Sequence, residues 1–206
     1  MARDSVRPAS RPTLVRVWTH LASWLVKSGE VPQLEPGDTF PGIAVRAVCW
    51  SVTPAEGPHG MELATGPDPT GEPSFHYAIT GDVEWCREPS SMLLRVGDRD
   101  FVTEPRERKV LGFRLPAVHD RVSVLATLEV MGAYETDAFD YPDVRRDWWV
   151  AGLKLEHREL VTSPDFPDTR EPGRIVRIDD IPQMLRWADA SGRDHATYLL
   201  DLEPSG

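Results

Sequence analysis

Apolar and polar residues alternate over long stretches of the chain, and this alternation predicts β-strands. The clearest run covers residues 122–134, where every second residue from Val122 to Val130 is apolar and Tyr134 continues the same face. Residues 43–49 and 148–160 alternate in the same way. Because successive side chains of a strand point to opposite faces, we expect strands with one buried face at these positions.

Shorter segments complete the pattern. Residues 75–79, 83–86, 174–178 and 196–203 are short strand candidates. Residues 91–104 predict a hairpin with Gly97 and Asp98 at its tip, since glycine supplies the positive φ that a tight turn requires. The expected fold class is mainly β, an antiparallel barrel or sandwich of short strands with one short helix near each end.

The two helices are predicted from helical spacing and from capping residues. Over residues 14–28 one helical face carries apolar residues, with Thr13 as N-cap and Gly29 as the stop. The β-branched Val15 and Val17 leave a strand at 14–18 as the alternative. A second short helix is expected over 181–191, ending at Gly192.

We expect one domain with a disordered tail. Residues 1–12 contain arginine and proline without an apolar core, and they do not form a secretion signal. Residues 13–203 are expected to fold as a single β-rich domain, within which 13–30 could be a helical appendage. Stretches dense in proline, glycine or aspartate predict long loops at 53–74, 135–147 and 162–173.

The charge balance limits the classes of partner. The formal net charge is −10, which disfavours binding to nucleic acid or to an anionic membrane surface. Arginine greatly outnumbers lysine and asparagine is absent, as expected for a bacterial genome rich in GC. Cys49 and Cys86 are too few for a disulfide scaffold, so we expect reduced thiols in a cytoplasmic protein.

The sequence lacks the motifs of the common catalytic and cofactor sites. It contains no glycine-rich phosphate loop, no HExxH, no CxxC and no GxSxG. The six histidines are scattered singly, so no element offers a metal ion two ligands. We therefore expect no cofactor, no metal and no catalytic residue of a known class.

The loop at 135–147 and the strand that follows it hold the best binding candidates. The stretch DAFDYPDVRRDWW combines acidic, basic and aromatic residues. By strand parity Trp149 shares the face of Leu153 and is expected in the core, whereas Trp148 points to the opposite face. Exposed aromatic residues beside arginine are typical of binding hot spots. The expected function is non-catalytic binding of another protein, through side chains that this region exposes: Tyr141, Arg145, Arg146 and Trp148.

Two alternatives remain open at this point. A barrel could bind a small molecule in a pocket lined by Trp50, Trp85 and Trp149. A carboxylate-dependent hydrolase could use the same loop, with the catalytic residues Asp140, Asp143 and His157.

Overall fold

The chain folds into a β-rich structure with two short helices among the residues described. The computed structural model describes residues 16–64, 66–87, 91–106, 116–138, 141–163, 168–185 and 197–205. The elements are, in chain order, β1 (Val17–Ala22), α1 (Ser23–Ser28), β2 (Thr39–Ile43), β3 (Val45–Pro54), β4 (Gly60–Ala64), β5 (His76–Arg87), β6 (Ser91–Val96), β7 (Arg99–Pro105), β8 (Arg121–Val130), α2 (Ala133–Ala138), β9 (Arg146–Thr162), β10 (Arg170–Asp180) and β11 (Thr197–Pro204).

Five strands close into a barrel. The ring runs β8-β3-β7-β6-β5 and returns to β8, with β4 added at the outer edge of β5. All neighbours in the ring are antiparallel except β3 and β7, which run parallel. The β-rich class and the barrel are therefore as predicted, but the pairing is mixed rather than purely antiparallel.

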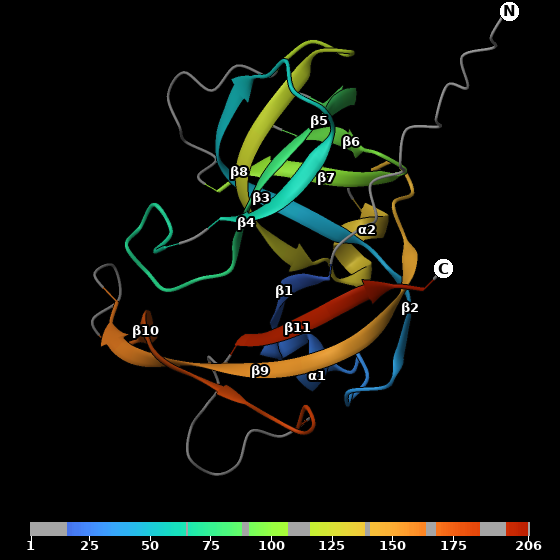
Figure 1. Cartoon of the computed structure of the whole chain (residues 1–206). Coiled ribbons are helices and arrows are strands. Elements are labelled where there is room, and N and C mark those ends of the chain that lie inside the picture. The colour runs from blue at the N-terminus through green and yellow to red at the C-terminus, as the bar shows by residue number, and fades with distance from the viewer. Residues whose placement is uncertain are drawn as a thin grey trace, which may run out of the picture.

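An outer sheet lies against one end of the barrel (Figure 1). It contains β1, β11, β9 and β10 in that order, and β2 pairs with the beginning of β9. Strand β1 pairs antiparallel with β11 along its whole length, so the first and the last described strands lie side by side. Among the described residues, the outer sheet and the barrel share one backbone pair in register, the parallel pair His20–Glu129.

Strand β8 changes its neighbour part-way along. One edge pairs with β3 from residue 122 to residue 130. The other edge pairs with β5 over residues 121–126, and then meets β1 only at Glu129. Thr127 and Leu128 therefore lie where β5 and β1 diverge, and we call this position the strand fork.

One continuous hydrophobic core fills the barrel and extends beneath the outer sheet. It contains the apolar positions that alternation predicts on β3 and β8, such as Ala47, Cys49, Val124 and Leu128. A smaller cluster centred on Val102 packs on the outside of the barrel. No helix in the described part of the chain is long and apolar enough to cross a membrane.

The predicted helix at 14–28 is wrong over residues 17–22, and the alternative strand at 14–18 is confirmed for residues 17 and 18; residues 13–15 lie outside the described part. Residues 17–22 form β1, and only residues 23–28 are helical. Val17 and Thr19 are β-branched and Trp18 is aromatic, which favours a strand once β11 is present to pair with it. The predicted stop is confirmed, because Gly29 follows α1 with a φ of 83°.

Three of the predicted loops contain regular structure. The segment 53–74 includes β4, the segment 135–147 begins in α2 and ends in β9, and the segment 162–173 ends in β10. Tyr134, expected on the buried face of a strand, belongs to α2 and is 73% exposed. Strand β8 ends at Val130, and α2 begins three residues later at Ala133.

The predicted hairpin at 91–104 is confirmed, with Gly97 at its tip in a positive-φ conformation. The closing strand is confirmed as β11. Of the helix predicted over 181–191, residues 181–185 are not helical, and residues 186–191 lie outside the described part. The tail at 1–12 also lies outside it.

A β-bulge reverses the predicted orientation of the two adjacent tryptophans. Gly152 pairs with Asp201 and Val150 with Leu202, so Ala151 is an extra residue on β9. An extra residue moves every side chain before it to the opposite face. Trp148 is consequently buried, whereas Trp149 is 45% exposed. The prediction that Trp148 is exposed and Trp149 lies in the core is wrong.

Candidate functional site

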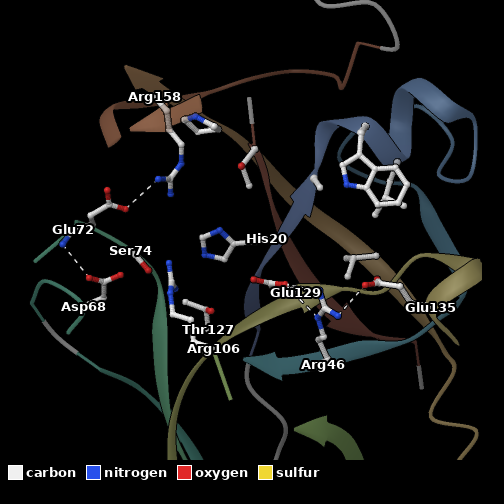
Figure 2. Close-up of a pocket in the computed structure, with 16 residues that line it drawn as sticks. His20, Arg46, Asp68, Glu72, Ser74, Arg106, Thr127, Glu129, Glu135 and Arg158 are labelled. Atoms are coloured by element: carbon white, nitrogen blue, oxygen red, sulfur yellow. Dashed lines mark hydrogen bonds and ion pairs between the residues drawn. The ribbon is translucent and has the colours of Figure 1, made fainter. Parts of the chain in front are cut away.

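A polar cavity of about 360 Å³ opens at the strand fork (Figure 2). Its floor is formed by β1 and β8 through His20, Ala22, Thr127 and Glu129. The loop before β5, the end of β7, the strands β9 and β10, and the helices α1 and α2 supply its walls. The cavity thus lies between the barrel and the outer sheet, where β8 has no neighbour on one edge.

His20 lies in the middle of the cavity, with Arg158 and Arg106 on one side and Glu129 on the other (Figure 2). Its Nδ1 is 3.6 Å from Oε1 of Glu156, a residue of β9 that is completely buried. Burial, together with the positive charges of Arg158 and Arg106, lowers the pKa of His20 to about 4. His20 is therefore a neutral imidazole at pH 7.

Arg158 connects β9 with the loop before β5. Its Nη1 donates to Oε2 of Glu72 at 3.2 Å and to the carbonyl oxygen of Gly173 at 3.0 Å. Its Nη2 lies 3.4 Å from Oε2 of Glu156. Burial nevertheless raises the pKa of Glu156 to about 7, and the attraction of Arg158 opposes this shift.

Asp68 gives the loop before β5 its shape. Its Oδ1 accepts hydrogen bonds from the backbone N–H groups of Thr70 and Glu72. Gly71 adopts a φ of 85° in the turn and donates to the backbone oxygen of Asp68. Burial opposes ionisation of Asp68, but these hydrogen bonds and the one from the Thr70 hydroxyl outweigh it and lower its pKa. The wall that carries Glu72 and Ser74 is thereby held in place.

Arg46 of β3 organises the opposite end of the cavity. Its guanidinium lies 3.0 Å from carboxylate oxygens of both Glu129 and Glu135, and 3.5 Å from Glu104 (Figure 2). Burial opposes its charge, but the three carboxylates outweigh this effect and raise its pKa. Glu135 also accepts a hydrogen bond from the backbone N–H of Gly132, which ties α2 to this network.

Three polar atoms of cavity residues are buried without a hydrogen-bond partner in the described part of the chain. They are Nε2 of His20, Oγ of Ser74 and Oγ1 of Thr127. Arg106 adds a guanidinium that lies 5.2 Å from the centre of the Trp50 ring and pairs with no carboxylate of the described residues. Buried polar groups are normally hydrogen-bonded, so the three buried atoms are available to an occupant. Arg106 is exposed, and its guanidinium adds further donors at the cavity wall.

Trp148, predicted as a binding residue, is a core residue in this structure. Its Nε1 donates to the backbone oxygen of Ile43 at 3.3 Å, and the guanidinium of Arg99 lies 5.2 Å from the ring centre. Burial lowers the pKa of Arg99. The exposed member of the pair is Trp149.

The other predicted binding residues lie outside the cavity. Tyr141 packs edge-on against Trp85 and donates its hydroxyl hydrogen to Oε1 of Glu104, and its pKa is raised by burial and by this hydrogen bond. Arg145 pairs with Asp137 on the surface. Arg146 donates to the backbone oxygen of Asp98 in the turn between β6 and β7. A binding role for these three stays a prediction.

The residues of the predicted hydrolase are placed on different elements where the structure describes them. Asp143 caps a turn by accepting a hydrogen bond from the backbone N–H of Arg145. His157 lies further along β9 and pairs with Asp179 of β10 at 3.0 Å. Asp140 lies outside the described residues.

A ligand pocket lined by Trp50, Trp85 and Trp149 stays a prediction. None of Trp50, Trp85 and Trp149 lines the cavity at the strand fork. Cys49 is buried and Cys86 is partly buried, and the two are not joined by a disulfide. No three histidine, cysteine or acidic side chains in the described ranges are arranged to hold a metal ion.

Sequence spacing contains no signal for this cavity, because its residues come from segments far apart in the chain. His20 was assigned to a helix, and Asp68, Glu72 and Ser74 fell in a stretch assigned as loop. Alternation on β1 could have placed His20 on the face opposite Val17 and Leu21. Only the pairing of β1 with β8 brings that face to Thr127. No protein family, curated protein or solved structure matches the chain.

Proposed function

We propose that the protein binds a small polar organic molecule in the cavity at the strand fork. The observation that supports this most strongly is the set of unpartnered buried atoms on His20, Ser74 and Thr127. A buried polar atom without a hydrogen bond costs about 1–3 kcal/mol, and an occupant with polar groups would recover part of that cost. The cavity volume of about 360 Å³ falls within the range of small-molecule sites.

Binding of another protein through the stretch at 135–148 has less support. That prediction depended mainly on an exposed Trp148, and this side chain is 3% exposed. The arginines of the stretch are engaged in surface contacts, which are typical of a solvated loop. We therefore favour a small-molecule ligand over a protein partner.

A thermal-shift screen against a library of metabolites tests the proposal. A molecule that binds only the folded state stabilises it by RT ln(1 + [L]/Kd), about 2.7 kcal/mol at a hundredfold excess over Kd. We expect at least one class of polar metabolites to raise the midpoint of unfolding.

A matched pair of variants assigns the binding to this cavity. Thr127→Phe places a ring in the cavity, whereas Ser123→Phe adds the same ring to the same face of β8 outside it. The stabilisation should disappear in Thr127→Phe and persist in Ser123→Phe. Equal stabilisation of both variants, or no stabilisation of the wild type by any metabolite, would overturn the proposal.

A further inference from the structure

One end of the cavity presents positive and hydrogen-donating groups. The side chains of Arg106 and Arg158 extend towards His20 from opposite walls (Figure 2). Both arginines line the cavity together with His20, and their positive charges lower its pKa. Guanidinium groups are the preferred partners of carboxylate and phosphate oxygens, because their N–H groups match the geometry of two oxygens.

Arg106 is the arginine that is free to bind. Arg158 is already held by Glu72 and Glu156, and Arg46 at the other end is held by carboxylates. Arg106 has no such partner among the described residues, although Asp68 lies near enough to be influenced by its charge. Its position against the Trp50 ring orders the side chain without using its hydrogen-bond donors.

Nε2 of His20 and the hydroxyl groups of Ser74 and Thr127 complete this end. A neutral imidazole can carry its hydrogen on Nε2 and donate it to an oxygen of the occupant, and the two hydroxyl groups can donate as well. An acidic group bound here would therefore meet donors from five separate segments of the chain.

The carboxylates around the cavity limit the charge of the occupant. The acidic lining residues are Asp68, Glu72, Glu129 and Glu135, which outnumber the arginines of the lining. A single acidic group can be neutralised by Arg106, but further negative charges would approach these carboxylates and be repelled. The arrangement disfavours polyanions such as nucleoside triphosphates.

The cavity lining also includes side chains that can contact an apolar body. Ala22, Leu25 and Val130 line it, and Trp24 of α1 contributes an indole that is 52% exposed. A large aromatic side chain left half-exposed at the edge of a cavity provides a surface on which a planar or aliphatic group can pack.

We propose that the occupant is a small organic acid, with one carboxylate or phosphate group held by Arg106, Arg158 and His20 and an apolar body against Trp24. This inference rests on the proposed function, because it assigns a chemical class to the molecule that the cavity binds. The two acid types share the same recognition chemistry, and the experiment distinguishes them.

Calorimetric titration with four probes tests the inference. Phenylacetate and phenyl phosphate carry the acidic group and the ring, phenylacetamide replaces the acid with a neutral amide, and inorganic phosphate lacks the ring. We expect at least one of the two aromatic acids to bind about tenfold or more tightly than the amide. Whichever acid binds more tightly identifies the natural head group.

Two substitutions in the cavity and one control outside it locate the acid. Arg106→Gln should weaken binding of the preferred acid about tenfold or more, whereas Arg174→Gln, an exposed side chain of β10 that does not line the cavity, should leave it unchanged. Trp24→Ala should weaken the aromatic acids without changing the affinity for inorganic phosphate.

The outcomes separate this inference from the proposed function. If metabolites stabilise the wild type and Thr127→Phe abolishes the effect, but the amide binds as tightly as the acids, the cavity binds small molecules and the acid assignment is wrong. Unchanged acid binding in Arg106→Gln also overturns the assignment. If neither the probes nor the metabolites bind, the proposed function itself fails.

Discussion

His20 and Glu156 form a buried pair in which burial shifts both groups towards their neutral forms. The pKa of His20 falls to about 4, and that of Glu156 rises to about 7. Their separation of 3.6 Å is short enough for an ion pair. Between these two pKa values, however, the imidazole is unprotonated and the carboxyl is protonated, so the pair contributes no charge to the cavity floor.

Glu156→Gln should change stability in a pH-dependent way. The folded-state pKa of Glu156 is raised above its ordinary value of 4.5, so the folded protein holds this proton more strongly than the unfolded chain does. The stabilising effect is complete below pH 4.5 and is lost as pH rises to about 7, with an upper bound of about 3 kcal/mol. We expect urea unfolding at pH 5 and pH 8 to show that the unfolding free energy of Glu156→Gln, relative to that of the wild type, is higher at pH 8 than at pH 5. A pH-independent difference would contradict this.

Binding of phenylacetate should weaken as pH rises from about 5.5 to about 8. Ionisation of Glu156 near pH 7 adds a negative charge beside His20, and a bound acid favours protonation of His20, which is easier at low pH. Calorimetry across this range checks the trend, with Glu156→Gln expected to flatten it. An affinity independent of pH would contradict this. The charged groups that face His20 are Glu156, Arg158, Arg106, Asp68 and Glu129.

At the scale of the element, the bulge at Ala151 decides which tryptophan of β9 enters the core. Alternation of apolar and polar residues identifies the buried face of a strand only while every residue has a partner on the neighbouring strand. Leu153 and Leu155 are buried as alternation predicts, and the extra residue then reverses the pattern for Val150 and Trp148.

Trp148→Ala should cost about 3–5 kcal/mol of unfolding free energy, because it removes a large buried side chain and leaves a cavity. Trp149→Ala should cost less than about 1 kcal/mol, since this residue is half-exposed. Chemical denaturation of the two variants in parallel measures both. If the larger loss occurred in Trp149→Ala, the bulge would be misplaced.

Elements whose pattern is local were predictable from the sequence. The alternation on β3 and β8 and the Gly97 turn between β6 and β7 depend on neighbouring residues only. The sequence predicts a helix where β1 forms, because the local preference of these residues for a strand is weak and the pairing partner, β11, lies far along the chain. Strand β4 was missed because its glycine- and proline-rich surroundings carry no strand signal, and its pairing with β5 decides its structure.

At the scale of the molecule, the barrel and the outer sheet are joined along a narrow seam. Within the part of the chain that the structure describes, only His20 and Glu129 pair in register across it. A second link is the phenol of Tyr77 on β5, which accepts a hydrogen bond from the backbone N–H of Trp18 at 2.7 Å. Burial raises the pKa of Tyr77 to about 12, so the phenol keeps its proton.

Tyr77→Phe should lower the unfolding free energy by about 1–2 kcal/mol, because it leaves the Trp18 N–H without its acceptor. Tyr134→Phe is the matched control, since Tyr134 is 73% exposed and its hydroxyl group should contribute less than about 0.5 kcal/mol. Equal stability of the two variants under urea would show that the Tyr77 link does not hold the seam.

The candidate site was not predictable for the same reason that β1 was not. Arg106 and His20 are far apart in the sequence, and each lies in an unremarkable local context. Their convergence follows from the pairing of β3 with both β7 and β8 and of β8 with β1, which no local pattern reveals. The loop at 135–147, by contrast, is predicted as a binding site from its acidic, basic and aromatic composition, and composition does not indicate where side chains point.

The pairing of β1 with β11 has a consequence for the order of folding. The barrel strands β3 and β5–β8 lie between residues 45 and 130, so the barrel can form while the chain is still being synthesised. Strand β1 emerges first but pairs with β11, near the end of the chain, and such distant contacts form slowly. Since the cavity requires both β1 and β9, it is completed last. A newly made chain should therefore acquire a stable barrel before it acquires a binding site.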